Sequence, residues 1–428
     1  MSFDKFKKDS KAILKVGSGN FLEMYDFSIF GLYAPIIAKI FFPNSNQLVA
    51  IIQTFMVFAA GSFMRPVGAI FLGAYMDKFG RKNGLMVTLT LMAIGTASIA
   101  LCPSYKDIGI LAPIIVVIGR LIQGFSAGAE LGGVVIYLSE IAPKGLKGFY
   151  VAWQSASQQV ATAFAAGLGL ALHYLLGEEF LTQSWGWRIP FLIGCLVIPL
   201  LFIIRRSLEE TPEFSGKKQQ PKTLTSMIKN ACLNFRLVIA GVALIMTTTT
   251  FYYFITVYTP TYAKNILHFS NIQGFGVTAL VAINNLFWLL VSGYIGDKIS
   301  RKPVLIFATI LGLFTAYPVL YLLTQHTTLS MLIFSELWLS FIYGVYNGTV
   351  TIALAEIVPK EVKALGFSFA YSIAVAIFGG LTPTISTELI SLTNNPAIPG
   401  LWLSFVALCS LTATIYVYSR KDLYARQA

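Results

Sequence analysis

The stretch GAYMDKFGRK at residues 73–82 decides the fold, because it returns 220 residues later as GYIGDKISRK at residues 293–302. Two further segments recur in the same order. YAPIIAK at 33–39 returns as YTPTYAK at 258–264, and EIAPK at 140–144 returns as EIVPK at 356–360. The three offsets of 225, 220 and 216 residues are nearly constant. The chain is therefore expected to contain one structural unit twice.

The composition excludes a soluble protein. Of the 428 residues, 56% are hydrophobic and 12% are charged, and the mean hydropathy is +0.71. A soluble domain usually has about twice that share of charged residues. The low charge and the 33 phenylalanines also exclude a disordered chain. A polytopic membrane protein remains, because apolar runs of about 20 residues match the thickness of a bilayer.

Twelve apolar runs are long enough to span a bilayer as helices, so we expect an all-α polytopic fold. The expected spans are 17–41, 48–75, 84–103, 110–139, 150–176, 187–204, 237–263, 273–296, 303–323, 330–355, 364–390 and 399–418. The expected organisation is a leader at 1–16, six-helix bundles at 17–204 and 237–418, a cytoplasmic linker at 205–236 and a tail at 419–428. Many secondary transporters use such repeats as two halves that rock about a midplane site.

The distribution of positive charge predicts the orientation. On the side of the expected N-terminus lie 25 of the 31 Lys and Arg residues. Two others, Arg65 and Arg120, lie inside spans, which leaves Lys39, Lys106, Arg188 and Lys264 on the opposite side. Because cytoplasmic loops are enriched in Lys and Arg, both termini are expected in the cytoplasm. The net charge of +12 is thus an orientation signal, and no nucleic-acid partner is expected.

The repeated motif has the residues of a gate between helices. Its first glycine, Gly73 or Gly293, lets one helix approach another closely. Its aspartate can accept hydrogen bonds from the N-terminus of a neighbouring helix, and its arginine can pair with a glutamate. Alternatively, the cations serve only the topology. The residues expected to form the gate are Gly73, Asp77, Arg81, Glu140, Asp297, Arg301 and Glu356.

The pattern G-x-x-x-D-[RK]-x-G-R-[RK], present twice between expected spans, is the loop signature of the major facilitator superfamily. The chain resembles that superfamily over its whole length. The resemblance implies twelve helices in two bundles that open alternately to either side of the membrane. In the second copy Ser300 replaces a glycine, which weakens the case for a tight turn there.

Six ionisable side chains lie well inside expected spans, where a charge is costly and therefore indicates function. They are Glu23, Asp26, Arg65, Arg120, Glu130 and Glu336. Glu23 and Asp26 are three residues apart and share a helix face. Two carboxyl groups this close in a partly dry cavity favour binding of a proton. We expect Asp26, Glu23 and Glu130 to take part in proton coupling; the alternative for the first two is a fixed ion pair with Arg65 or Arg120.

Arg65 and Arg120 predict an anionic substrate. Arg65 lies twelve residues before Asp77, about 18 Å along a helix and hence near mid-membrane. Two guanidinium groups at such depth favour a carboxylate held by paired hydrogen bonds. The alternative for Arg120 is structural, because R-x-x-Q-G is common in the fourth span of the resembled superfamily whatever is carried.

Further polar residues complete the expected cavity, although each alone is more often a hydrogen bond between helices. They are Gln154, Gln158, Thr249, Asn285, Tyr346 and Asn347. The sequence has no nucleotide-binding or hydrolase motif where it could act, and its histidines and cysteines are scattered. We therefore expect no enzyme activity, no metal and no cofactor, with the proton as coupling ion.

Three stretches narrow the resemblance to the metabolite:proton symporters within the superfamily: GNFLEMYDF at 19–27, MRPVGA at 64–69 and WGWRIPF at 185–191. Three others are similar to the citrate–proton and tricarballylate symporters of bacteria: WQSASQQ at 153–159, FITVYTPTY at 254–262 and FGGLTPTIS at 378–386. Glu336 departs from this pattern, because that subgroup is expected to have an apolar residue there. It either faces water, pairs with a cation or marks a different cargo.

The sequence thus predicts a proton-coupled importer of citrate or a similar tricarboxylate. The expected partners are protons, the anion and the lipid bilayer. The expected protein is a monomer that spans the bacterial cytoplasmic (inner) membrane several times. The alternative cargo is another organic anion: tricarballylate, a dicarboxylate such as 2-oxoglutarate, or shikimate. A sensor or a passive channel built on the same scaffold is the rival class, and the paired gates argue against an open pore.

Overall fold

The computed structural model describes Ile13 and residues 20–79, 81–128, 130–183, 185–206, 235–358 and 363–419. These residues form helices joined by short turns, with no β-strand among them. Within them, nine helices are long and apolar enough to cross a bilayer, and a tenth span results if one bent pair counts as a single crossing. Large apolar side chains such as Leu196 and Phe314 are 76% and 70% exposed on the outside of the bundle, as suits contact with lipid.

The N-terminal half begins with the helix Asn20–Leu32. Its other elements are α2 (Ala34–Phe41), α3 (Gln47–Phe79), α4 (Arg81–Ala100), α5 (Tyr105–Ile108), α6 (Leu111–Ala127), α7 (Glu130–Ile141), α8 (Lys147–Gln183), η1 (Trp185–Arg188) and α9 (Ile189–Arg206). The C-terminal half comprises α12 (Phe235–Tyr252), η2 (Tyr253–Tyr258), α13 (Thr259–Asn265), α14 (Asn271–Ile299), α15 (Arg301–Gln325), α16 (Leu329–Ile357), α17 (Lys363–Ala374), η4 (Val375–Gly379), α18 (Thr382–Thr393) and α19 (Pro399–Ser419).

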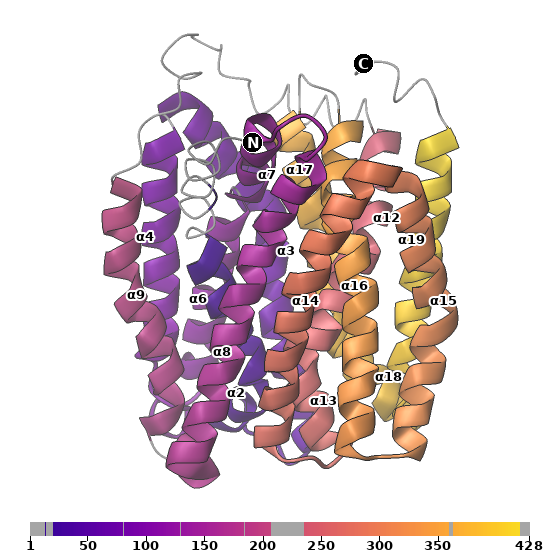
Figure 1. The fold of residues 1–428 in the computed structure, drawn as a ribbon. Helices are drawn as coiled ribbons and strands as arrows, with labels where there is room; N and C mark the ends of the chain where they lie inside the picture. Colours follow the sequence, from indigo (N-terminus) through magenta and orange to yellow (C-terminus); the bar gives the residue numbers. More distant parts are fainter. Residues whose placement is uncertain are drawn as a thin grey trace.

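The two halves stand side by side as separate bundles (Figure 1). They meet along two seams, where α8 packs on α14 and α3 packs on α17 and α18. We call the end of the bundle that carries Asp297 and Arg301 the motif end, and the end that carries Lys39 and Lys264 the far end. The seams run from one of these ends to the other.

Prolines reshape several of the expected spans. The expected span 17–41 is two helices, because the axis turns by 67° between Asn20–Leu32 and α2. Pro35, in the first turn of α2, has no N–H with which to continue the preceding helix. In the C-terminal half, the π-helical turns η2 and η4 end two residues before Pro260 and four residues before Pro383. A wider turn relieves the clash between a proline ring and the preceding turn of helix.

Candidate functional site

Close packing of α3 on α6 places the two predicted arginines beside one another. A Cβ atom on Gly124 would lie 1.7 Å from the carbonyl oxygen of Gly61, and one on Gly128 would lie 2.0 Å from that of Arg65. Only glycine fits at such contacts, so the backbones touch. Arg65 of α3 and Arg120 of α6 therefore reach the same helix, Asn20–Leu32.

Phe27 on that helix is where the two arginines converge. The Arg65 and Arg120 Cζ atoms lie 4.4 and 4.3 Å from the centroid of its ring. Arg120 also lies over Phe30 at 4.5 Å and Phe58 at 5.0 Å, and it is fully buried, whereas Arg65 is 5% exposed. Aromatic faces attract a cation and thus offset part of its lost hydration. This aromatic platform explains how two positive charges lie together inside the protein.

Glu23 neutralises Arg65. Its Oε1 lies 3.1 Å from Arg65 Nη2, and both side chains are almost completely buried. The ion pair is one of the two roles that the sequence left open for Glu23. The Nε atom of Arg65 has no hydrogen-bond partner among the described residues. A guanidinium with a free N–H donor can bind a further anionic group.

Asp26 reaches Arg120 through a second residue. Thr96 donates a hydrogen bond to Asp26 Oδ2, and Gln123 Nε2 contacts Thr96 Oγ1 at 3.1 Å and Asp26 Oδ2 at 3.5 Å. The other end of Gln123 accepts from Arg120 Nη1 at 2.7 Å. Within the described residues, Arg120 Nε, Arg120 Nη2 and Asp26 Oδ1 have no hydrogen-bond partner. Buried polar atoms are rarely left unsatisfied, so this arrangement is suited to a ligand.

A chain of polar side chains continues from the N-terminal into the C-terminal half. Asn285 Nδ2 donates to Gln159 Oε1 at 3.0 Å and Ser340 donates to Asn285 at 2.6 Å. Tyr343 accepts from Gln159 at 3.3 Å and from Asn347 at 2.9 Å. The predicted residues Asn285 and Asn347 are thus joined by Gln159 and Tyr343. Sequence reasoning left these two out of the site, although Gln159 follows Gln158 in the same polar stretch.

The remaining predicted cavity residues have varied surroundings. Thr249 donates to backbone carbonyl groups, and Tyr346 donates to the carbonyl oxygen of Leu244 at 2.7 Å, so both hydroxyls hold the C-terminal half together. Gln154 is buried on α8, where its Nε2 has no partner among the described residues and its Oε1 accepts from Ser155. Gln158 is also buried on α8.

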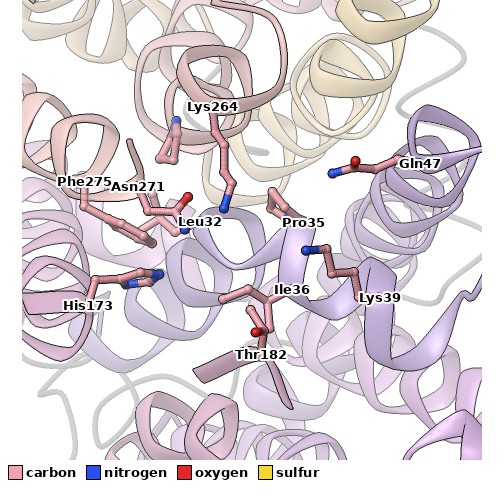
Figure 2. A pocket seen from close by; sticks show the side chains of 11 residues that line it. Leu32, Pro35, Ile36, Lys39, Gln47, His173, Thr182, Lys264, Asn271 and Phe275 are labelled. Carbon is pink, nitrogen blue, oxygen red and sulfur yellow. The ribbon is translucent and has the colours of Figure 1, made fainter. Parts of the chain in front are cut away.

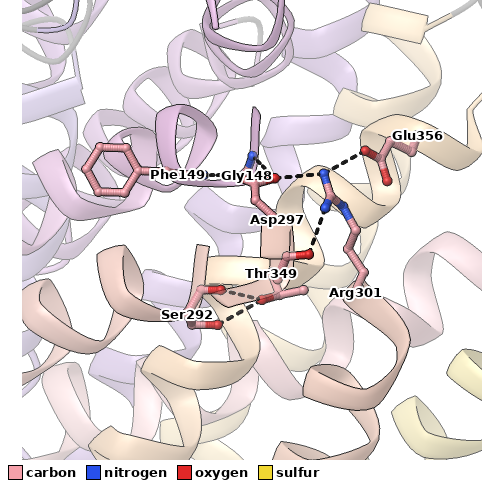
Figure 3. Close-up of polar contacts among 8 residues, drawn as sticks. Gly148, Phe149, Ser292, Asp297, Arg301, Thr349 and Glu356 are labelled. Atoms are coloured by element: carbon pink, nitrogen blue, oxygen red, sulfur yellow. Dashed lines mark hydrogen bonds and ion pairs between the residues drawn. The ribbon is translucent and has the colours of Figure 1, made fainter. Parts of the chain in front are cut away.

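At the motif end, Asp297 joins the two halves (Figure 3). It accepts from the backbone N–H groups of Gly148 at 2.8 Å and Phe149 at 2.9 Å, in the first turn of α8. Arg301 lies 3.0 Å from Asp297 and 2.9 Å from Glu356. These are the contacts that the motif predicted: an aspartate at a helix N-terminus and an arginine paired with acids.

Glycine contacts differ between the two copies of the motif. A Cβ on Gly293 would lie 2.8 Å from the carbonyl oxygen of Gly148, so here α14 and α8 approach closely. A Cβ on Gly73 would meet no described atom within 4 Å, so the described residues show no close approach there and the role expected of Gly73 stays a prediction. Among the described residues, the second copy makes a contact between the halves at this end. Ser300, which replaces a glycine, still adopts a left-handed φ of 107° between α14 and α15.

The first copy of the gate is largely undescribed. The side chains of Asp77, Arg81 and Glu130 lie outside the described residues, so their predicted contacts are not placed. Glu140 is exposed near the end of α7.

The far end is closed as well, because Gln47 Nε2 donates to Asn265 Oδ1 at 3.0 Å and Lys264 pairs with Glu178. Contacts between the halves therefore exist at both ends of the bundle.

Glu336 is fully buried in α16. Neither of its carboxyl oxygens has a hydrogen-bond partner among the described residues, nor does it form an ion pair with any of them. Of the roles considered for it, the pair with a cation is therefore not found in the part of the chain described. The same part holds no group of three or more His, Cys, Asp or Glu side chains arranged for a metal ion.

Comparison with known proteins agrees with this geometry. The sequence profile of the Major Facilitator Superfamily matches residues 16–383. The chain is 53% identical to a citrate-proton symporter of Klebsiella pneumoniae, over 97% of this chain and 94% of that protein, and 51% identical to one of Salmonella typhi, over 96% and 94%. The solved structure of a proton:xylose symporter of the superfamily superposes with a TM-score of 0.76 at 18% identity, covering 97% of this chain and 98% of that one.

The chain therefore belongs to the major facilitator superfamily. It has the all-helical fold of that family and is a transporter, not an enzyme. Its location is the inner membrane of a bacterium, which it crosses several times.

Proposed function

We propose that this protein imports citrate or a similar tricarboxylate together with protons by alternating access. The observation that carries the proposal is the pair of buried guanidinium groups, Arg65 and Arg120, which have hydrogen-bond donors without a partner among the described residues. Carboxylates bind such donors in pairs of charge-assisted hydrogen bonds. The similarity to citrate-proton symporters over nearly the whole chain supports the same substrate class.

Glu23 couples the proton to the substrate in this proposal. While Glu23 is ionised, it occupies Arg65 as an internal carboxylate. A proton on Glu23 removes the negative charge and frees Arg65 for a carboxylate of the substrate. Proton and anion thus favour each other's binding, which is the requirement for symport.

Asp26 provides a second coupled position. A proton on Asp26 weakens its contacts with Thr96 and Gln123, and Gln123 is the residue that orients Arg120. The charge state of Asp26 is thereby transmitted to the second guanidinium. The membrane potential, negative inside, adds a driving force of about 2.3 kcal/mol per 100 mV for each net positive charge carried inward.

We extend the proposal to the topology. Twelve spans in bundles at 17–204 and 237–418, with both termini and the linker 205–236 in the cytoplasm, are supported by the charge distribution and the internal repeat. The motif end is then the cytoplasmic gate, where Asp297 binds the first turn of α8 across the halves and Arg301, paired with Glu356, also pairs with Asp297. The protein acts as a monomer and needs no cofactor besides the coupling proton.

Uptake by purified protein in proteoliposomes tests the function. We expect labelled citrate to accumulate against its gradient when an inward proton gradient is imposed, and tricarboxylates to compete better than dicarboxylates or shikimate. Arg65→Ala should abolish this uptake, whereas Lys106→Ala, a change on exposed α5, should not. Preferential competition by 2-oxoglutarate or shikimate would transfer the proposal to that anion. Normal citrate uptake by Arg65→Ala would remove Arg65 from the site.

A further inference from the structure

Cations are rare at the far end, and two of them meet between the halves. In the topology expected from the sequence, four of the 31 Lys and Arg residues belong to this side: Lys39, Lys106, Arg188 and Lys264. Arg188 is occupied, because it donates to the carbonyl oxygens of Ala100 and Cys102 and stacks on Trp187. Lys106 lies on the short, exposed helix α5. Lys39 and Lys264 line one recess between the N-terminal and C-terminal halves.

The two lysines occupy equivalent positions of the internal repeat. Lys39 ends the segment 33–39 and Lys264 ends its copy at 258–264. Figure 2 shows their side chains directed toward the same recess from opposite sides, with Gln47 beside them. Duplicated halves related by a pseudo-twofold axis place equivalent residues face to face. A substrate that approaches the seam would therefore meet one ammonium group from each half.

The two ammonium groups differ in their partners. Lys264 forms an ion pair with Glu178 of α8, whose side chain is half exposed. Lys39 is exposed and forms no ion pair with a described residue, although it lies near enough to Glu178 for an electrostatic interaction. An exposed single ion pair contributes only about 0–1 kcal/mol. A carboxylate from solution can therefore replace Glu178 at little cost.

We propose that Lys39 and Lys264 form an outer capture site for polycarboxylate anions, and that Glu178 occupies Lys264 while the far end is closed. An incoming carboxylate takes the place of Glu178, which breaks a contact between the halves and helps the far end to open. A second carboxylate of the same molecule binds Lys39. The inference rests on the proposed function, since it requires an anionic cargo with more than one carboxylate and a far end that faces outward.

Initial rates of labelled citrate uptake test the capture site. Lys39→Gln and Lys264→Gln should each raise the KM for citrate by roughly three- to tenfold with little change in kcat, as expected for a lost charge contact at a surface. Glu178→Gln should lower KM, because it removes the internal competitor. Raising the ionic strength should increase the KM of the wild type and have little effect on a Lys39→Gln/Lys264→Gln double variant. Lys106→Gln is the control for a lysine of the same side.

The direction of the changes in KM distinguishes a capture site from an ion pair that only holds the far end closed. If the Lys264–Glu178 pair only holds the far end shut, Glu178→Gln and Lys264→Gln shift KM in the same direction, which overturns the proposal. An unchanged KM in the lysine variants, with normal uptake by the wild type, overturns the capture site alone. Absence of tricarboxylate uptake by the wild type overturns both this inference and the proposed function.

Discussion

In the proposed mechanism, the Glu23–Arg65 pair controls whether a substrate carboxylate can bind Arg65. The two side chains lie 3.1 Å apart and are nearly fully buried. Loss of one partner from a buried pair costs about 3–5 kcal/mol, mostly because the other charge is left uncompensated. A carboxylate that replaces Glu23 restores the lost interaction. Glu23 and a substrate carboxylate would make the same contact with Arg65, so the strength of the Glu23–Arg65 pair indicates how strongly Arg65 can bind a substrate.

Glu23→Gln should reveal this exchange. We expect the purified variant to lose about 3–5 kcal/mol of stability without citrate, and citrate to raise its Tm by more than it raises that of the wild type. Uphill uptake should fail, because no proton is needed to free Arg65, while citrate exchange persists. Glu179→Gln, an exposed neighbour of Glu178, is the control. An unchanged Tm in the absence of citrate would contradict the role given to Glu23.

At the scale of elements, the contact between α8 and α14 closes the motif end. Asp297 binds the first turn of α8, and Gly293 brings the two backbones together at that point. Each backbone hydrogen bond from a helix N-terminus to a carboxylate is assisted by the helix dipole. The seam therefore depends both on charge and on the absence of a side chain at residue 293.

Gly293→Ala should keep the motif end from closing. The added Cβ would lie 2.8 Å from the carbonyl oxygen of Gly148, and overpacking of this kind costs about 1–3 kcal/mol. We expect citrate uptake to fall about five- to hundredfold, and a cysteine introduced at Ala152 to react faster with a thiol reagent. Gly276→Ala on the same helix is a matched control, because its Cβ would meet no described atom within 4 Å. Equal uptake by the two variants would refute the role of this contact.

At the scale of the whole molecule, this conformation is closed at both ends. Asp297 joins the halves at the motif end, and Gln47 with Asn265 joins them at the far end. Alternating access requires that one of these sets breaks while the other holds. A covalent link at the far end should therefore stop the cycle without disturbing the fold.

A Gln47→Cys/Asn265→Cys variant, in a background without the four native cysteines, should test this requirement. A short bis-thiol crosslinker should abolish citrate uptake by the double variant, and a cleavable crosslinker should allow full recovery after cleavage. Each single variant with the same reagent provides the control. Undiminished uptake by fully crosslinked protein would show that the far end need not open.

Several features could be predicted from the sequence because they depend on composition and short-range pattern. The apolar runs near 303–323 and 399–418 became α15 and α19 with nearly the same bounds, since bilayer thickness sets their length. The repeat gave the residues of the motif-end contact, Asp297, Arg301 and Glu356. Arg65 and Glu23 stood out because a charge in an apolar run is expensive.

Other features depended on how distant segments pack. The sequence left open which acid neutralises Arg65, and the approach of α3 to α6 decided for Glu23 and joined Asp26 to Gln123 and Thr96. Of the close approaches expected at Gly73 and Gly293, the described residues show the one at Gly293, where α14 packs on α8.

The sequence by itself determined that this chain is a duplicated, all-helical membrane protein with arginines deep in its first half. The length of an apolar run and a charge within it can both be read from a short stretch of sequence. Only the tertiary structure decided which residues meet: Phe27 beneath both arginines, Gln159 with Asn285 across the halves, and Lys39 opposite Lys264. These contacts join residues far apart in the chain, and helix packing rather than local pattern brings them together.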